Sequence, residues 1–307
     1  YLYGTAGTGK TYMAEQLAKF LNYDYIAINC NQYTSPLEIV GGQTIEGYQE
    51  GKLIRAWGNL DITGTKPSGY NGAVLCIDEM PKLDPNTAGL LNDALAKVKN
   101  ITNDGTLKIM PTIENGKGEK IRKRNLIVIA TGNLKLNEIS TEYEANFKQD
   151  LSLQDRFAGS TYRVMFNYKS EWEGTMRGFA FIFIPMMKLR EKIIEQRYTG
   201  YAFVSRRILM SLKDTYKTYR EVMEQNSASK KANGIPDALT QPKTVVDGVD
   251  AFLSLFKPEQ IDRLKEAMGY DSFVRIVEEK NKLPITDLDT PAELKEVNNL
   301  IDANQTQ

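Results

Sequence analysis

The first part of the chain alternates short apolar runs with stretches of helical periodicity. Four runs rich in β-branched and aromatic residues predict strands at 25–30, 73–77, 126–131 and 162–167. Their apolar positions are nearly continuous, which is typical of strands covered on both faces, so we expect a parallel sheet sandwiched by helices. Residues 1–3 have the pattern of a strand end, and we expect the start of that strand to be missing from a truncated N-terminus.

From about residue 169 onward the apolar positions recur with helical spacing. The clearer predicted helices lie at 187–197, 206–223, 258–267 and 292–301. The polar stretch 226–242 predicts a loop. We therefore predict two domains, an α/β core at 1–168 and an all-α region at 169–307. The apolar run 179–187 is far shorter than the roughly 20 residues of a membrane helix, and Pro185 interrupts it, so we expect no membrane span.

The amino-acid composition excludes several kinds of catalytic and metal-binding site. The 307 residues include no histidine, which excludes Ser-His-Asp and Cys-His catalysis, imidazole metal sites and an imidazole pH switch. The 39 basic residues balance 39 acidic ones, so the overall charge does not favour a protein that coats nucleic acid or an anionic membrane. Cys30 and Cys76 lie in apolar runs and are too few for a zinc cluster. We expect two buried thiols in a reducing, cytoplasmic compartment.

A phosphate-binding motif opens the chain. Residues 4–11 match G-x-x-x-x-G-K-[ST] in full and lie between a strand end and a predicted helix at 12–21. In such a loop the backbone N–H groups surround a phosphate, Lys10 reaches the β- and γ-phosphates, and the Thr11 hydroxyl ligates Mg²⁺. The alternative is a Gly-rich turn that happens to precede a helix. The predicted nucleotide-contacting residues are Gly4, Thr5, Ala6, Gly7, Thr8, Gly9, Lys10, Thr11 and Tyr12.

The apolar strand predicted at 73–77 runs directly into two adjacent acids, Asp78 and Glu79. Such a pair is the expected partner of a phosphate-binding loop. Asp78 can hold Mg²⁺ directly or through water, and Glu79 can orient and deprotonate an attacking water molecule. The alternative is a strand that merely ends in two solvated acids.

With these two motifs the chain resembles the AAA+ ATPases, and further segments extend the resemblance over about residues 1–215. Residues 126–133 look like the strand that ends in the first sensor, which implies that Asn133 lies beside the γ-phosphate and the attacking water. Residues 153–157 contain the Asp-Arg-Phe signature of the MoxR and CbbQ-like ATPases and their dynein-related kin. In those relatives this arginine reaches the nucleotide of the neighbouring subunit, which implies the same role for Arg156.

Ser205, Arg206 and Arg207 are similar to the start of the lid helix that carries the second sensor. The register implies Arg207 as the sensor and Arg206 as the second choice, although many relatives have proline where Arg206 stands.

Each sensor and finger assignment has a structural alternative. Asn133 could be a turn residue that terminates a strand. Arg156 could be a structural arginine paired with Asp155 or Glu144. Arg207 could be an ordinary charge on a helix surface.

The resemblance implies a P-loop AAA+ core followed by a helical lid and a C-terminal helical extension. It also implies ATP and Mg²⁺ as ligands and a closed homo-oligomeric ring, typically a hexamer, because a finger in trans requires a neighbouring subunit at each nucleotide.

Two insertions are candidate contacts with a partner. In the helix-two-insert clade the region of residues 41–51 carries a loop that faces the central channel, which makes Tyr48 a candidate substrate contact, with a flexible surface loop as the alternative.

Residues 106–124 look like the β-hairpin that precedes the first sensor, with a candidate turn at Asn115. Its cations are Lys117, Lys120, Arg122, Lys123 and Arg124. They could contact an acidic partner or a nucleic-acid backbone, or form a solvated face.

Three functions are compatible with these motifs. The first is an ATP-driven machine of the MoxR/CbbQ type that remodels a protein client, with a von Willebrand factor A-domain protein as the adaptor that the resemblance suggests. The second is a nucleic-acid-directed motor subunit like the McrB-like restriction ATPases, which use GTP; the balanced charge counts against it. The third is a regulatory module that holds ATP as a static ligand, against which the complete catalytic motifs argue.

Overall fold

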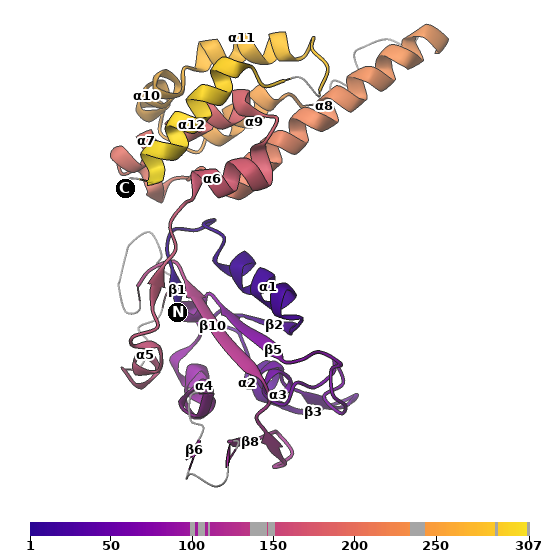
Figure 1. Ribbon diagram of the computed structural model, residues 1–307, viewed down its shortest axis with the longest axis vertical. Helices are drawn as coiled ribbons and strands as arrows, with labels where there is room; N and C mark the ends of the chain where they lie inside the picture. The colour runs from indigo at the N-terminus through magenta and orange to yellow at the C-terminus, as the bar shows by residue number, and fades with distance from the viewer. Residues whose placement is uncertain are drawn as a thin grey trace. The chain divides into compact units, whose positions relative to one another are not determined.

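The computed structural model describes residues 1–98, 102–103, 108–109, 111–135, 146, 151–233, 243–285 and 288–305. They form two compact units, Tyr1–Met165 and Phe166–Gln307, each with its own hydrophobic core (Figure 1). The division falls after Met165, whereas the sequence analysis places it after Tyr168. Tyr168 is buried in the core of the second unit, and Phe166 packs against that core.

The first unit is built on a five-stranded parallel sheet with the strand order β11-β1-β10-β5-β2. The strands are β1 (Leu2–Tyr3), β2 (Asp24–Asn29), β5 (Ala73–Asp78), β10 (Leu126–Gly132) and β11 (Tyr162–Arg163). β5 lies between β10 and β2 and is buried along most of its length, which explains its unbroken apolar run. The predicted fold class, a parallel α/β sheet followed by an all-α region, is confirmed.

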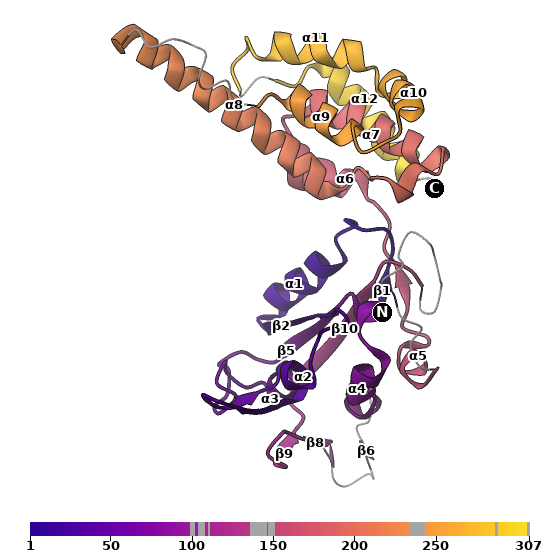
Figure 2. The same cartoon turned by 180° about the vertical axis from the view of Figure 1, so that it is seen from behind.

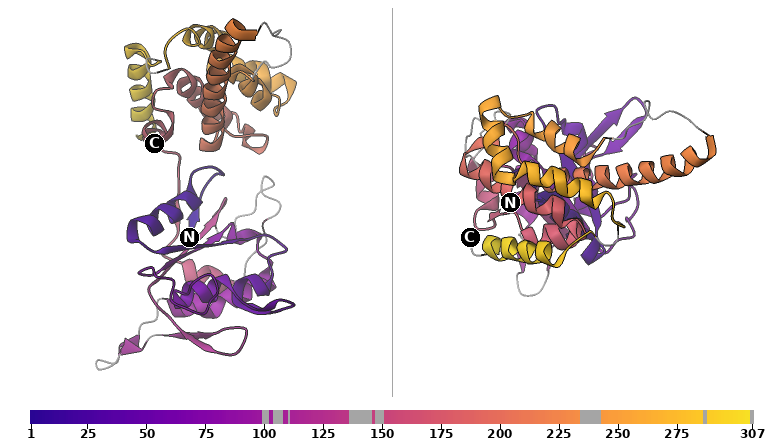
Figure 3. Two further views of the ribbon diagram at one scale, coloured as in Figure 1. Left: turned by 90° about the vertical axis from the view of Figure 1, so that its right-hand side faces the viewer. Right: turned by 90° about the horizontal axis from the view of Figure 1, so that it is seen from above.

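Helices cover both faces of this sheet. Helix α1 packs over β5 and β2 on one face, while α3 contacts the same strands from the other face, where α2 and α4 also lie (Figures 1 and 3). The helices are α1 (Lys10–Leu21), α2 (Pro36–Val40), α3 (Lys52–Gly58), α4 (Pro85–Val98), α5 (Leu151–Phe157) and the short η1 (Met80–Lys82). Small residues, Ala14 and Ala18, form the buried side of α1 and let it approach the sheet closely.

Antiparallel hairpins extend from the first unit. The paired strands are β3 (Gly41–Thr44) with β4 (Gly47–Glu50), β6 (Thr102–Asn103) with β7 (Lys108–Ile109), and β8 (Thr112–Glu114) with β9 (Lys120–Arg122). The β3–β4 hairpin is the segment in which the sequence analysis places a channel-facing loop. The β8–β9 hairpin turns at Asn115, where the sequence analysis places its turn.

The second unit is helical. Its elements are α6 (Tyr168–Glu171), the π-helical turn η3 (Trp172–Met176), α7 (Ala180–Glu195), η4 (Tyr198–Gly200), α8 (Arg206–Asn233), α9 (Val245–Leu253), α10 (Pro258–Met268), α11 (Tyr270–Lys280) and α12 (Pro291–Gln305). Helix α7 is central and contacts α8, α10, α11 and α12. The distal half of α8 extends beyond the other helices of this unit (Figure 2).

Three sequence predictions are corrected. Residues 226–233 are helical, not a loop, because α8 continues to Asn233 and meets its first glycine at Gly234. The strand predicted at 162–167 ends at Arg163, and the Asn167 side chain instead caps α6 by accepting from the Ser170 N–H. The helix predicted to begin at residue 187 begins at Ala180, with Pro185 inside it.

Both cysteines are buried, as the sequence analysis predicts, and neither forms a disulfide. Burial raises the pKa of the Cys30 thiol to about 12 and that of Cys76 to about 11, so both thiols stay neutral and weakly nucleophilic near pH 7. In the part of the chain that the structure describes, no helix combines the length and the apolar character that spanning a bilayer requires.

Candidate active site

The loop between β1 and α1 has a positive φ at Gly4, Gly7 and Gly9, a backbone that glycine adopts most easily. Gly4 has φ +149°, and a Cβ atom there would lie 2.2 Å from the Val164 carbonyl oxygen. Gly9 has φ +91° and forms the left-handed cap from which α1 begins. The first turn of α1 contains no acidic side chain and no side-chain cap. The N–H groups of this turn, and the positive end of the helix dipole, therefore suit a phosphate.

Lys10 is the first residue of α1 and is 7% exposed. Its Nζ atom donates to the carbonyl oxygens of Gly4 (2.8 Å) and Thr5 (3.1 Å) and to Oδ1 of Asn133 (3.2 Å). Asn133 directly follows β10, so this bond joins the loop to the neighbouring strand. The structure thus brings Lys10 and Asn133 together at the carboxyl ends of the parallel strands, where open α/β sheets bind their ligands.

Asp78 ends β5 beside the start of α1. Its Oδ1 atom accepts a hydrogen bond from the Thr11 hydroxyl (2.7 Å) and another from the Thr131 hydroxyl (2.6 Å). The Thr11 hydroxyl and the Asp78 carboxylate are hard oxygen donors, and no group of three or more His, Cys, Asp or Glu that could hold a metal occurs among the described residues. This donor set fits Mg²⁺, which takes one or two protein ligands and completes its shell with phosphate and water.

Glu79 has a left-handed backbone, φ 54°, which is uncommon for a residue other than glycine. Its N–H donates to the Thr131 hydroxyl (2.9 Å). Its carboxylate forms an ion pair with Lys82 in the η1 turn that follows, and it remains partly exposed to solvent. The acid is therefore held next to Asp78 with its side chain at the surface of the site.

Thr131 is the residue that the sequence analysis does not single out. It is fully buried at the end of β10 and contacts both members of the acidic pair. The available signal is a hydroxyl residue directly after the apolar run 126–130, two positions before Asn133.

Other residues of the loop take different positions. Tyr12 is about half exposed on α1. Thr8 donates its hydroxyl to the Thr5 carbonyl oxygen at 3.0 Å, so it closes a turn within the loop. Ala6 is exposed at the loop surface, and Gly7 has φ 82°.

Arg156 lies on α5 in the first unit. Within the described residues it forms no ion pair with Asp155, and its buried Nε atom has no hydrogen-bond partner. The other pairing considered from the sequence involves Glu144, which lies outside the described residues. The next residue, Phe157, packs its ring 6.1 Å from that of Tyr1 and anchors the end of α5.

Arg206 and Arg207 begin α8 in the second unit, so they are described separately from the loop and its acids. The Arg206 Nε atom donates to the Thr175 hydroxyl (2.8 Å). Arg207 is exposed and lines a shallow depression along α8.

Tyr48 is not part of an unstructured loop. Its hydroxyl donates to Oε1 of Glu50 (2.9 Å) and accepts from the Gly116 N–H (3.0 Å), and the Lys117 Nζ atom lies 4.4 Å above its ring. The β3–β4 and β8–β9 hairpins are therefore joined. At the turn of the first hairpin, Ile45 is fully exposed.

The predicted basic cluster is divided by this arrangement. Lys117 stacks on Tyr48, and Lys123 is buried at 8% exposure. Lys120, Arg122 and Arg124 are exposed.

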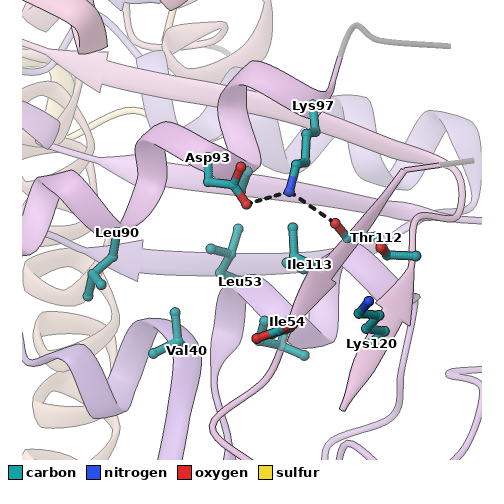
Figure 4. Close-up of a pocket in the computed structure, with 11 residues that line it drawn as sticks. Val40, Leu53, Ile54, Leu90, Asp93, Lys97, Thr112, Ile113 and Lys120 are labelled. Carbon is teal, nitrogen blue, oxygen red and sulfur yellow. Dashed lines mark hydrogen bonds and ion pairs between the residues drawn. The ribbon is translucent and has the colours of Figure 1, made fainter. Parts of the chain in front are cut away.

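A separate cavity of about 460 Å³ lies between α4, α3 and the β8–β9 hairpin (Figure 4). Leu53, Ile54 and Ile113 form its apolar lining, and Lys97 donates to Asp93 (2.6 Å) and to the Thr112 carbonyl oxygen (3.3 Å) at its rim. It shares no lining residue with the loop or the acidic pair.

The chain was compared with curated proteins, with solved structures and with protein families. Two bacterial relatives are uncharacterized proteins: YojN of Bacillus subtilis, 30% identical over 109 residues, and SERP0979 of Staphylococcus epidermidis, 28% identical over 109 residues. Each alignment takes in 36% of this chain, and the chain spans only 34% of YojN and 40% of SERP0979. A solved structure of RuvB from Thermotoga maritima aligns with a TM-score of 0.41 at 16% identity, over 73% of this chain and 56% of that chain.

The family match covers more of the chain than either relative. Residues 1–157 match the AAA domain of the dynein-related subfamily. This segment holds the loop at 4–11, the acidic pair, Asn133 and Arg156. Because it amounts to just over half of the 307 residues, the chain belongs to the dynein-related subfamily of AAA domain proteins.

Proposed function

We propose that this protein binds ATP with Mg²⁺ and hydrolyses it. The observation that carries the proposal is the continuous set of hydrogen bonds that joins Thr11, Asp78 and Thr131 beside the loop that holds Lys10. Family membership supports a nucleotide as the ligand. The start of α1 and the carboxyl ends of β5 and β10 then supply the metal ligands, the cation for the phosphates and the polar residue that faces the attacking water.

In this proposal each side chain has one task. Lys10 and the N–H groups of α1 bind the β- and γ-phosphates, while Thr11 and Asp78 hold Mg²⁺. The bound metal ion would neutralise charge that develops on the phosphate oxygens. Glu79 takes a proton from the attacking water, and Asn133 orients that water. Lys82 pairs with the Glu79 carboxylate and holds it close to the site.

We further propose that the chain acts in a homo-oligomeric ring, hexameric as is typical of AAA+ proteins, with Arg156 reaching the nucleotide of the adjacent subunit. Arg207 is proposed as the second sensor. The ring would act as a remodelling machine of the MoxR/CbbQ type on a protein client, with a von Willebrand factor A-domain protein as the proposed adaptor. Nucleic acid is not favoured as the client, because the charges of the chain balance.

The client-facing residue in this proposal is Ile45 and not Tyr48. Ile45 is fully exposed at the hairpin turn, whereas the Tyr48 hydroxyl and ring are both engaged with the neighbouring hairpin. Burial of this exposed apolar side chain against an apolar segment of a client would be favourable.

The substitution Glu79→Gln tests the proposal. We expect the variant to bind a fluorescent ATP analogue as the wild type does, while phosphate release falls by about 10² to 10⁴, the usual contribution of a general base. Glu114→Gln, an exposed acid on β8, is the matched control and should keep wild-type turnover. Unchanged turnover in Glu79→Gln would show that Glu79 is not the general base. Faster turnover with GTP than with ATP, or stimulation by DNA, would favour the nucleic-acid motor instead.

A further inference from the structure

We infer that Thr131 is a positioning residue of the proposed ATPase site, and that its single hydroxyl aligns the metal-ligand carboxylate with the backbone of the catalytic base. The inference rests on the proposed function. It adds a residue that neither the motifs nor the family match singles out, and it depends on hydrogen bonds between β5 and β10.

The Thr131 hydroxyl acts as a hydrogen-bond donor to one residue of the acidic pair and as an acceptor from the other. It donates to Oδ1 of Asp78 (2.6 Å) and accepts from the Glu79 N–H (2.9 Å). Strands β5 and β10 pair in parallel up to Ala130 and Ile77, so Thr131 and Asp78 follow directly after the last registered pair. The geometry of the sheet therefore places this hydroxyl beside the acids.

The bond to Asp78 orients a carboxylate that must serve a metal. The Oδ1 atom of Asp78 accepts from Thr131 on one side and from Thr11, the other proposed Mg²⁺ ligand, on the other. A hydrogen bond from a neutral hydroxyl to an ionised carboxylate is stronger than one between neutral groups. Thr131 therefore restricts rotation of the Asp78 side chain without contributing a charge of its own.

The bond from Glu79 acts on the backbone. A residue with a Cβ atom is strained in the left-handed region, and Glu79 has φ 54°. The Thr131 hydroxyl accepts a hydrogen bond from the N–H of this residue, which helps to hold the turn from which the Glu79 carboxylate reaches Lys82. One buried side chain thus couples the metal ligand and the proposed base.

The test compares Thr131→Val, which keeps the shape but removes the hydroxyl, with Thr131→Ser, which keeps the hydroxyl. The matched control is Thr44→Val, which removes a hydroxyl that donates to the Gly47 carbonyl oxygen in the β3–β4 hairpin. Three properties are measured for each chain: the affinity for a fluorescent ATP analogue with Mg²⁺ and with EDTA, the Mg²⁺ dependence of phosphate release, and the hydrogen exchange of the Glu79 amide.

We expect Thr131→Val to need about 10- to 100-fold more Mg²⁺ for half-maximal turnover, the usual cost of losing the partner of a metal ligand. Nucleotide affinity in EDTA should stay at the wild-type level, and the Glu79 amide should exchange at least about tenfold faster, which corresponds to the loss of one hydrogen bond of about 1.4 kcal/mol. Thr131→Ser should restore the Mg²⁺ dependence, and Thr44→Val should resemble the wild type.

Two results would overturn the inference. Wild-type Mg²⁺ dependence and amide exchange in Thr131→Val would show that the hydroxyl positions nothing. An equal loss of nucleotide affinity with and without Mg²⁺, with no rescue by serine, would show a purely structural role. A different result, a wild-type chain that binds no nucleotide, would overturn the proposed function itself while the exchange of the Glu79 amide still reports on the hydrogen bond.

Discussion

At the scale of single residues, Arg190 is the clearest case of a charge that the fold must neutralise. It is fully buried in the second unit and donates two hydrogen bonds to the Glu171 carboxylate, at 2.7 and 3.1 Å. A third bond, from Nε to the Val204 carbonyl oxygen, joins it to the segment just before α8, and its guanidinium stacks 4.3 Å from the Phe166 ring. One side chain thus ties together the entry to the unit, α7 and the segment that leads into α8.

Removing one partner of this pair should destabilise the second unit. We expect Arg190→Met to lower the unfolding free energy of that unit by about 3–5 kcal/mol, because Glu171 is left buried and unpaired. Adding Glu171→Leu should recover much of the loss, since a buried pair can be replaced by apolar residues. The chain offers a separate reporter for each unit, because its tryptophans are Trp57 in the first and Trp172 in the second.

Urea denaturation in a Trp57→Phe background follows the second unit through Trp172. The Trp172→Phe background follows the first unit, in which Arg190→Met should leave the midpoint unchanged. A loss in the second unit below about 1 kcal/mol, the range of a surface ion pair, would contradict the prediction.

At the scale of elements, the β3–β4 and β8–β9 hairpins, predicted as two separate partner contacts, are joined to each other by hydrogen bonds. Asn115 donates from Nδ2 to both Glu50 (3.1 Å) and Glu119 (2.9 Å), so Glu50 receives hydrogen bonds from Tyr48 on its own hairpin and from Asn115 on the other. Burial, followed by the hydrogen bond to Glu50, raises the pKa of Tyr48 to about 12. Because the raised pKa favours the neutral phenol, this contribution to stability is complete below about pH 10 and is lost as the pH rises toward 12.

We expect Tyr48→Phe and Asn115→Ala to be non-additive, because both side chains bind Glu50. Their coupling energy in a double-mutant cycle, measured by urea denaturation through Trp57, should be about 0.5 kcal/mol or more. Tyr33→Phe, which alters an exposed tyrosine, is the control and should change stability by less than about 0.5 kcal/mol. Additive effects of the two hairpin substitutions would mean that the hairpins do not stabilise each other.

Elements with a strong local pattern are well predicted from the sequence. Strands β2, β5 and β10 lie within one residue of their predicted ends because buried central strands are continuously apolar. The distal part of α8 is wrongly predicted as a loop, since its polar residues lack an apolar stripe although none of them breaks a helix. The short helices α9 and α11 are missed although each has a clear apolar face, because a short apolar run does not by itself distinguish a helix from other buried structure.

At the scale of the whole molecule, the proposed ring makes Arg156 the decisive residue. We expect Arg156→Ala to lower turnover by about 10³ to 10⁵, the range found for arginine fingers, while nucleotide affinity is retained. Because the arginine would act on the adjacent subunit, mixing Arg156→Ala chains with Glu79→Gln chains should restore part of the turnover that each variant lacks alone, since some sites then combine an intact Glu79 with an intact Arg156 from the neighbour.

Arg122→Ala, which alters an exposed arginine on β9, is the control for this experiment and should leave turnover unchanged. No recovery of turnover in the mixture of Arg156→Ala and Glu79→Gln chains would place Arg156 within its own subunit and would count against a shared site.

The glycine-rich loop at 4–11, the acidic pair and the class of the fold are determined by the sequence alone, because each depends on residues that are consecutive or recur at a fixed period. The loop needs glycines at Gly4 and Gly9 and a helix that starts at Lys10, and all of these lie within one short segment. Local backbone preference is sufficient for such features.

Only the tertiary structure decides which distant side chains meet. Lys10 and Asn133 are 123 positions apart, and Thr131 and Asp78 are 53 apart, yet parallel pairing brings each pair into hydrogen-bond contact. The same is true of Tyr48, whose role changes from a surface contact to a joint between hairpins once Gly116 is beside it. Hydrogen bonds between distant residues depend on sheet register and packing, which no local pattern of residues encodes.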